Sequence, residues 1–123
     1  MEFLETTTIP ASDTDLKNRL TIATLPSWCD SIEKILGDFK TRGEIYCVWG
    51  VFAIQREELL HGVRFTLPGC PYAMQWTVTT GHHPNPLHTV IHLTTNRTEH
   101  EAEFVDSIRQ FMLDWKKGLE SRW

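Results

Sequence analysis

Histidine and cysteine are the residue types in this chain that are best able to bind metal or act as nucleophiles. There are six histidines in 123 residues. His82 and His83 lie in a proline-rich segment, while His88 and His92 are four residues apart. On a strand, that spacing separates two residues by about 13 Å, too far to share one metal ion. We therefore predict no metal site, and the sequence leaves the role of these four histidines open.

The three cysteines, Cys29, Cys47 and Cys70, are odd in number and show no CxxC spacing. Free thiols in a reducing compartment fit this pattern best. Cys70 lies in a turn-like segment, but no neighbouring cation or helix start is visible that would favour its thiolate. No phosphate loop or G-x-S-x-G motif occurs either. The sequence therefore assigns no catalytic residue and no cofactor, and an enzyme is the less favoured interpretation.

Charge and hydropathy exclude several classes of partner. The net charge is −4 and the isoelectric point is about 5.8, so the chain as a whole does not attract polyphosphate. No apolar run reaches the roughly 20 residues of a membrane span. The first residues carry acids where a secretory signal carries bases, which predicts a cytoplasmic protein.

Residues 44–96 form a segment with very little charge. Within these 53 residues there are three acidic and two basic side chains, the bases being Arg56 and Arg64. Aromatic and β-branched residues are frequent here, which favours strands. Strands are predicted at 44–56, 59–67, 72–80 and 87–95, and the short connections between them predict an antiparallel meander.

A helix is predicted on each side of this meander. Across 27–43 the apolar residues follow helical spacing on one face, namely Trp28, Ile32, Ile35, Leu36 and Phe39. From Thr98, a capping-box pattern precedes a second apolar stripe that runs to Leu119. The predicted fold is one α+β domain over 1–123, in the order α-β-β-β-β-α, with both helices on one face of the sheet. Residues 1–18 are predicted to be a loose arm, and 20–24 a possible short edge strand.

The segment 44–56 is apolar at both odd and even positions, which is typical of a strand buried on both faces. Two helices cover one face of four strands but not both. We therefore expect an uncovered apolar face on Tyr46, Val48, Phe52 and Ile54, or on their opposite-parity neighbours. Such a face needs a partner. The sequence thus predicts a protein-interaction domain, an adaptor, chaperone or regulator that binds a second copy of itself or another protein.

Two alternatives remain open. The first is a small-ligand-binding protein or enzyme with a pocket between sheet and helices, lined by Trp28, Trp76 and Trp115. The second is a binder of single-stranded nucleic acid that stacks bases on sheet aromatics. Its candidate aromatics are Trp49, Phe52, Phe65 and Trp76. Because Arg56 and Arg64 are the only bases in this segment, nucleic acid is the weaker alternative.

Overall fold

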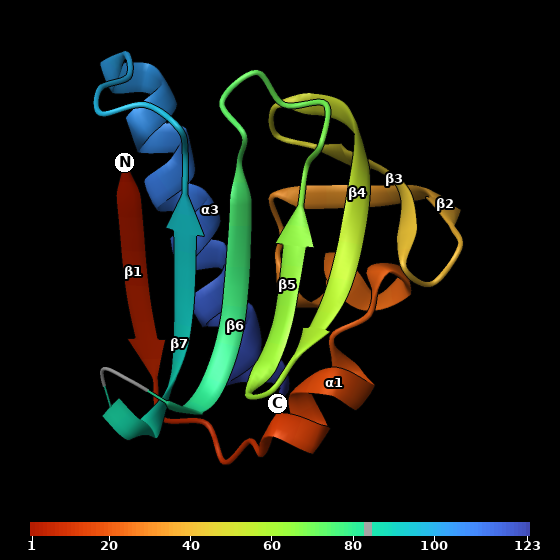
Figure 1. The fold of residues 1–123 in the computed structure, drawn as a ribbon, viewed down its shortest axis with the longest axis vertical. Helices are drawn as coiled ribbons and strands as arrows, with labels where there is room; N and C mark the ends of the chain where they lie inside the picture. Colours follow the sequence, from red (N-terminus) through yellow and green to blue (C-terminus); the bar gives the residue numbers. More distant parts are fainter. Residues whose placement is uncertain (83–84) are drawn as a thin grey trace.

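The computed structural model describes residues 1–82 and 85–123. Within those residues, one antiparallel sheet of seven strands has the order β1-β7-β6-β5-β4-β3-β2 (Figure 1). Its strands are β1 (Glu2–Thr7), β2 (Ile32–Asp38), β3 (Arg42–Cys47), β4 (Gly50–Leu59), β5 (Gly62–Thr66), β6 (Gln75–His82) and β7 (Asn85–Thr94). The helices are α1 (Asp13–Arg19), the 3-10 turn η1 (Ile22–Thr24), α2 (Leu25–Trp28) and α3 (Ala102–Arg122).

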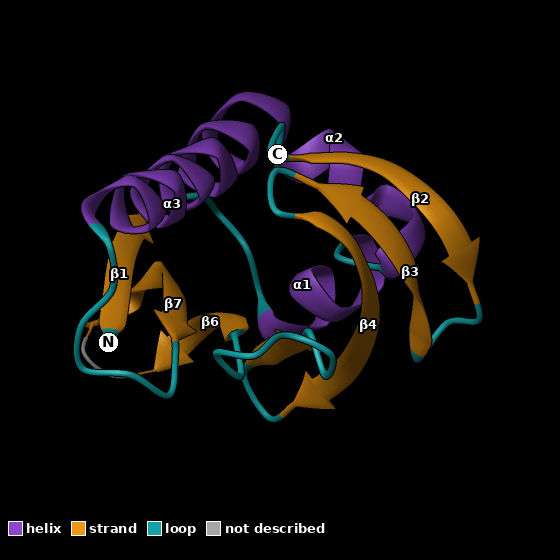
Figure 2. Cartoon of the chain, turned by 90° about the horizontal axis from the view of Figure 1, so that it is seen from above, coloured by secondary structure: helices purple, strands orange, loops and turns teal. Residues whose placement is uncertain are grey.

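The helices cover one face of the sheet, which we call the inner face. α3 packs against β1, β7 and α2, while α1 packs against β5 and β6. Figure 2 shows the sheet curving, with α3 over the β1 end and the β2–β4 strands bending toward the shorter helices. The outer face of β6 and β7 is polar, with half-buried Thr77, Thr79, His92 and Thr94. The core therefore lies between the sheet and the helices.

The α+β class and the antiparallel sheet were predicted correctly, but the four-stranded meander with two helices is wrong. The predicted helix over 27–43 is instead α2 followed by strand β2. The register of β2 against β3 shifts between Ile32 and Lys34, and again between Ile35 and Gly37. The first of these bulges inserts an extra residue, so Ile32 and Ile35 both face inward although they are three residues apart. This spacing imitates a helix.

The predicted single strand over 44–56 is also wrong, because it is two strands joined by a tight turn. Cys47 pairs with Gly50, which leaves Val48 and Trp49 as the turn residues. Gly50 has a φ of 114°, a conformation that glycine adopts without steric strain. A turn built from valine and tryptophan gives no ordinary turn signal. The two antiparallel strands therefore look, in sequence, like one strand that is apolar on both faces.

The segment predicted to be a loose arm contains β1 and α1. β1 pairs with β7 along its whole length, and Ser12 and Asp15 form a capping box at the start of α1. The segment 20–24, predicted as a possible edge strand, contains the 3-10 turn η1. These elements supply buried core residues from the first third of the chain, among them Phe3, Leu16 and Ile22.

The last predicted helix exists as α3, although it begins later than its capping pattern indicated. Its N-cap residue is Glu101, with no side-chain cap bond, so Thr98 does not cap the helix. The predicted apolar stripe faces the core, with buried Ile108, Phe111, Met112, Trp115 and Leu119. Near its end, a Cβ on Gly118 would lie 1.8 Å from the Trp28 carbonyl oxygen, so only glycine permits this approach of α3 to α2.

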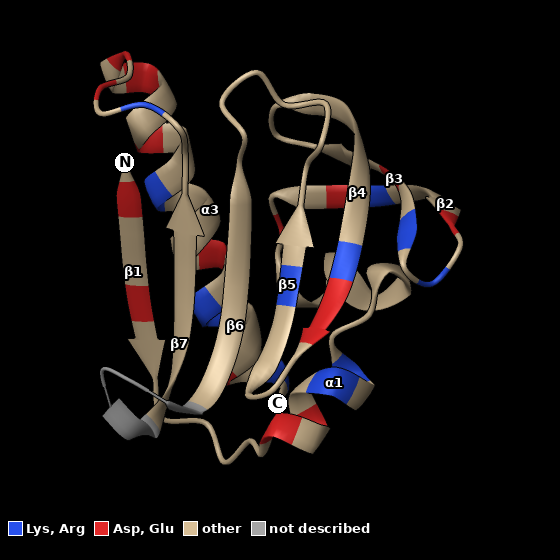
Figure 3. Ribbon diagram, viewed as in Figure 1, with Lys and Arg blue, Asp and Glu red and all other residues tan. Residues whose placement is uncertain are grey.

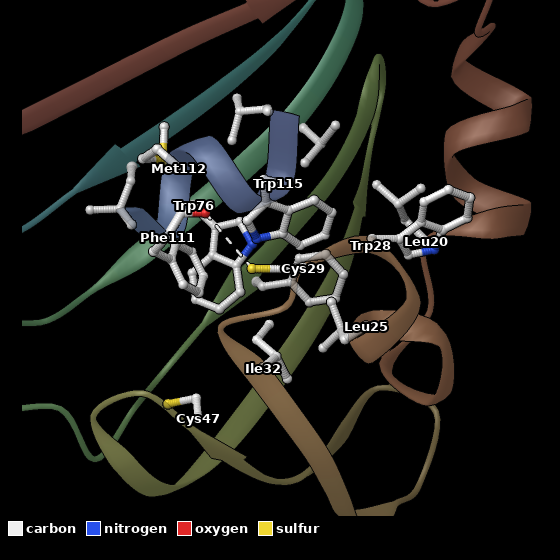
Figure 4. Close-up of a cluster of buried hydrophobic side chains, with 14 of the residues drawn as sticks. Leu20, Leu25, Trp28, Cys29, Ile32, Cys47, Trp76, Phe111, Met112 and Trp115 are labelled. Carbon is white, nitrogen blue, oxygen red and sulfur yellow. Dashed lines mark hydrogen bonds between the residues drawn. The ribbon is translucent and has the colours of Figure 1, made fainter. Parts of the chain in front are cut away.

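Aromatic rings fill the centre of the core. Phe65 stacks on Trp76 at 5.6 Å between ring centroids, and Trp76 meets Phe111 edge-on at 5.0 Å. Figure 4 shows Trp76, Phe111 and Trp115 beside Cys29, whose thiol donates to the Phe111 carbonyl at 3.7 Å. The indole N–H groups of Trp76 and Trp115 are buried without a partner among the described residues. Each costs about 1–3 kcal/mol of desolvation, so packing must offset this cost.

Candidate functional site: an apolar cavity at one end of the core

The core is open at the end where α3 begins. A cavity of about 240 Å³ lies there, between the first turns of α3, the β3–β4 turn and the segment after β5. Its lining is almost entirely apolar and consists of Trp49, Phe52, Leu67, Cys70, Pro71, Tyr72, Met74 and Phe104. We call it the Trp49 cavity. Leu67 and Met74 are fully buried, whereas the surrounding aromatic rings are half-buried.

Trp49 is held in place by α3. Its indole Nε1 donates to Ser107 Oγ at 2.8 Å, and Ser107 in turn donates to the Phe104 carbonyl at 2.6 Å. The indole also packs against Phe104 and Phe111, at 6.0 and 4.9 Å between ring centroids. The short turn between β3 and β4 makes this reach possible, because it presents the indole at the tip of the hairpin. The wall formed by Trp49 is therefore preformed.

The opposite wall is Tyr72, in the segment between β5 and β6. Leu67 and Cys70 fix this segment through backbone bonds, with Leu67 N–H donating to the Met74 carbonyl and Cys70 N–H donating to the Leu67 carbonyl. The Tyr72 carbonyl accepts from Asn96 N–H at 2.8 Å. The Pro68–Pro71 turn signal located this segment in sequence, but nothing in sequence showed that it faces α3.

A second, more polar cavity of about 480 Å³ shares Tyr72 and Phe104 with the first. Its remaining lining is charged or polar, namely Arg97, Glu99, His100 and Glu101. Arg97 lies over the Tyr72 ring at 4.9 Å, and His100 packs edge-on against the same ring. Partial desolvation lowers the pKa of His100, and the positive charges of the Met1 amino group and Arg97 lower it further. A neutral imidazole and a guanidinium thus lie beside the apolar cavity.

The residues predicted as an apolar interface do not lie together. Tyr46 and Val48 are exposed, at 44% and 53%, and point away from the core with Val51. Phe52 lines the Trp49 cavity and Ile54 is fully buried. The β3–β4 turn causes this separation, because even-numbered residues face outward on β3 and inward on β4. Tyr46, Val48 and Val51 form a small exposed patch, which we call the hairpin surface.

The tryptophans predicted to line a pocket, Trp28, Trp76 and Trp115, are buried core residues instead. Trp28 donates through Nε1 to the Arg19 carbonyl and packs against Trp123, while the guanidinium of Arg19 lies 4.0 Å from the Trp123 ring centroid. The cavity is lined by other aromatics, near the start of α3. None of the three tryptophans named from the sequence lines this cavity.

The described histidines lie in separate environments. His92 Nε2 lies 2.8 Å from Glu2 Oε1, and His88 is half-buried on the outer face. His83 and the side chain of His82 lie outside the described residues. Among the residues that are described, no group of three or more histidines, cysteines or acids could hold a metal ion.

The two arginines of the sheet region already have intramolecular partners. Arg56 donates to the carbonyls of Leu20 and Lys17, at 2.7 and 2.6 Å, and is nearly buried. Arg64 forms a bidentate pair with Glu57. Phe65 and Trp76, two of the candidate stacking aromatics, are fully buried on the inner face. The arrangement on which a nucleic-acid platform would rest is therefore not present in this sheet.

The cysteines occupy different environments. Burial raises the pKa of the Cys29 thiol far above its ordinary value, and burial also raises the pKa of Cys47. Cys70 is half-buried and belongs to the wall of the Trp49 cavity. A thiol with a raised pKa is held protonated and unreactive. Of these three residues, Cys70 is thus the one placed to contact a ligand.

Comparison with known proteins defines the fold. No family model and no curated protein matches this chain. Among solved structures, the protein XoxI from Bacillus cereus superposes with a TM-score of 0.65 at 12% identity, over 96% of this chain and 92% of that one. An uncharacterized protein from Bacillus thuringiensis gives a TM-score of 0.62 at 11% identity, over 98% of this chain and all of that one. At these identities the likeness shows a shared fold alone.

Among the described residues, the structure contains no helix with the length and apolar character needed to cross a bilayer.

Proposed function

We propose that this protein binds a small apolar molecule, or the apolar part of an amphipathic one, in the Trp49 cavity. The observation that carries the proposal is a preformed cavity of about 240 Å³ with half-buried aromatic walls and a buried floor of Leu67 and Met74. Ligand sites are concave, mainly apolar and close to a few polar groups. Here Arg97 and His100 are those groups, since their cavity shares Tyr72 and Phe104 with the Trp49 cavity.

The size of the cavity limits the ligand. A buried apolar cavity of about 150 Å³ is large enough to bind benzene. The Trp49 cavity is larger, so it suits one or two fused rings or a short branched alkyl group. Because Trp49 forms one wall, a bound ring changes its environment and therefore its fluorescence.

The test is a titration with 1-naphthol, followed by two-dimensional NMR and by tryptophan fluorescence. We expect saturable binding, with shifts at Met74 and at the Trp49 indole. Cys70→Phe fills the cavity and should abolish binding. The matched control is Val51→Phe, which places the same ring on the outer face of β4 and should leave binding unchanged. Absence of saturation, or binding that survives Cys70→Phe, would rule the proposal out.

A second candidate function is association with another protein through the hairpin surface. The observation in its favour is that Val48 and Val51 are more than half exposed beside Tyr46. Aromatic and aliphatic side chains grouped on a surface are typical of interfaces. If this surface associates at micromolar concentration, Val48→Lys should lower the measured mass. A monomeric mass at all concentrations, with no binding of an apolar dye, would contradict it.

A further inference from the structure

The outer edge of β1 pairs with no other strand among the described residues. β1 and β2 are the terminal strands of the sheet. Proteins commonly protect such edges with bulges, charges or proline. β2 has register shifts at Ile32/Lys34 and Ile35/Gly37. β1, by contrast, pairs with β7 in an unbroken register from Glu2 to Thr7. Its outer edge is therefore regular enough for a further strand to pair with it.

The alternation of hydrogen bonds along β1 shows which of its backbone groups do not bond to β7. Thr95 N–H donates to the Met1 carbonyl at 3.0 Å, and the Met1 nitrogen donates to the Thr95 carbonyl at 3.3 Å. This pair exchanges both bonds, and in an antiparallel ladder such pairs alternate with pairs that exchange none. Residues 1, 3, 5 and 7 therefore bond to β7. The N–H and C=O groups of Glu2, Leu4 and Thr6 point to the free edge.

A groove lies along this edge. A cavity of about 340 Å³ is lined by the consecutive residues 1–5 together with Arg109, Met112 and Leu113 of α3. Consecutive strand residues point to alternate faces, so a cavity that touches all of them faces the edge of the strand. Leu4 and Leu113 are about half exposed beside it. The groove therefore offers main-chain groups and apolar contact to an added strand.

Charge is arranged in a complementary way across this groove. β1 carries Glu2 and Glu5, and the part of α3 beside it carries Arg109 and Lys116 (Figure 3). Lys116 lies 3.8 Å from Glu5. The guanidinium of Arg109 lies 5.7 Å from the Phe3 ring centroid, on the inner face and toward the groove. One copy of this edge thus presents acidic side chains on the strand and two basic side chains on the neighbouring helix.

We propose that β1 pairs antiparallel with β1 of a second copy, joining two sheets into one continuous sheet. With Leu4 opposite Leu4 of the second copy, Glu2 lies opposite Thr6, and the free groups at 2, 4 and 6 bond to one another. The same register places Glu5 of the second copy beside Phe3, under the guanidinium of Arg109. The edge is therefore self-complementary in hydrogen bonding and in charge, as a two-fold interface requires. This inference is independent of the ligand proposal and uses another surface than the hairpin.

The test is sedimentation from micromolar to near-millimolar concentration. Leu4→Lys places like charges opposite each other at the two-fold axis, and we expect the dimer dissociation constant to rise about tenfold or more. Leu60→Lys is the matched control, because Leu60 is exposed in the turn between β4 and β5. This variant should dimerise like the unaltered protein. Circular dichroism of both variants verifies that each remains folded.

Leu4→Pro gives a second, backbone-specific test. It removes an N–H that points to the free edge and leaves the bonds of Phe3 and Glu5 to β7 intact, so it should yield folded monomer. Amide exchange by NMR then locates the contact, since Leu4 and Thr6 should gain protection as concentration rises. A monomeric unaltered protein would overturn the proposal. So would a dimer that persists in both Leu4 variants, or one that Val48→Lys alone abolishes.

Discussion

The two ends of the core use the same kinds of side chain to different effect. At the closed end, Trp28 and Trp115 are at most 6% exposed. At the open end, Trp49 and Tyr72 are half-buried and line a cavity. The closed end is covered by α1, η1 and α2 as well as by α3, whereas the open end is covered by the first turns of α3 and the segment after β5. The number of covering elements, rather than residue type, separates the sealed end of the core from the end with a cavity.

The largest expected effect is at the closed end. Trp115→Ala should lower the free energy of unfolding by about 3–5 kcal/mol, because a fully buried ring leaves a cavity that its neighbours cannot fill. Ile108→Ala, on the same face of α3, should cost about 2–5 kcal/mol. Urea unfolding of both variants measures this. An unchanged midpoint for Trp115→Ala would show that α3 does not dock through this face.

The corresponding change at the open end should cost less. Trp49→Ala removes a half-buried ring and its bond to Ser107, and we expect a loss of about 2 kcal/mol. Trp49→Phe keeps a ring and should cost about 1 kcal/mol, as should Ser107→Ala. The same urea titration compares these variants with Trp115→Ala. If Trp49→Ala were as costly as Trp115→Ala, the two ends would be equally sealed, contrary to the structure.

Two substitutions that each remove a side-chain hydroxyl distinguish a residue that caps a helix from one that only resembles a cap in sequence. Ser12 accepts from Asp15 N–H at 3.0 Å and caps α1 at the closed end, so Ser12→Ala should cost about 1 kcal/mol. Thr98 precedes α3 at the open end but does not cap it, and Thr98→Ala should change stability by less than about 0.5 kcal/mol. Thermal unfolding measures both variants. The reverse order would place the start of α3 at Thr98.

The smallest expected effect is a difference in labelling rate between two thiols. Because burial raises the pKa of Cys29, its thiolate stays scarce even in mildly alkaline solution, and a thiol reagent should leave it unlabelled in the folded protein. Cys70 is half-buried in the cavity wall and should be labelled first. Mass spectrometry of peptides after timed labelling gives the order, and Cys70→Ser is the control. A saturating ligand should slow the labelling of Cys70 and leave that of Cys47 and Cys29 unchanged.

Local patterns predicted part of this fold. The apolar stripe of α3 follows one face without interruption, and the alternation around Val63–Phe65 and Trp76–Val78 predicted β5 and β6. The predictions were wrong where the local residue pattern resembled that of another type of element. A bulge in β2 placed Ile32 and Ile35 at helical spacing, and the Val48–Trp49 turn carried residues that favour strands. β1 was missed because its partner β7 lies more than eighty residues away in sequence. Strand pairing at that separation produces no pattern within a short stretch of sequence.

The site was less predictable than the fold. A pocket between sheet and helices was one of the open alternatives, but the tryptophans chosen for it are buried core residues that do not line the cavity. Periodicity assigns a residue to one face of a helix or strand. It does not show at which point along α3 the core ceases to be covered. The prediction of an apolar face on residues 46–54 likewise depended on one strand that proved to be two.

The pairing of β1 with β7 also has a consequence in time. Phe3 aligns with Leu93, and α3, which follows β7, packs against β1. During synthesis at about 5–20 residues per second, β1 therefore stays unpaired for several seconds until β7 has been synthesised. Contacts of such long sequence separation are typical of slow folding. The hairpins from β2 to β6 can assemble first, so the first strand made is among the last to be incorporated, and until then both of its edges are open to chaperones.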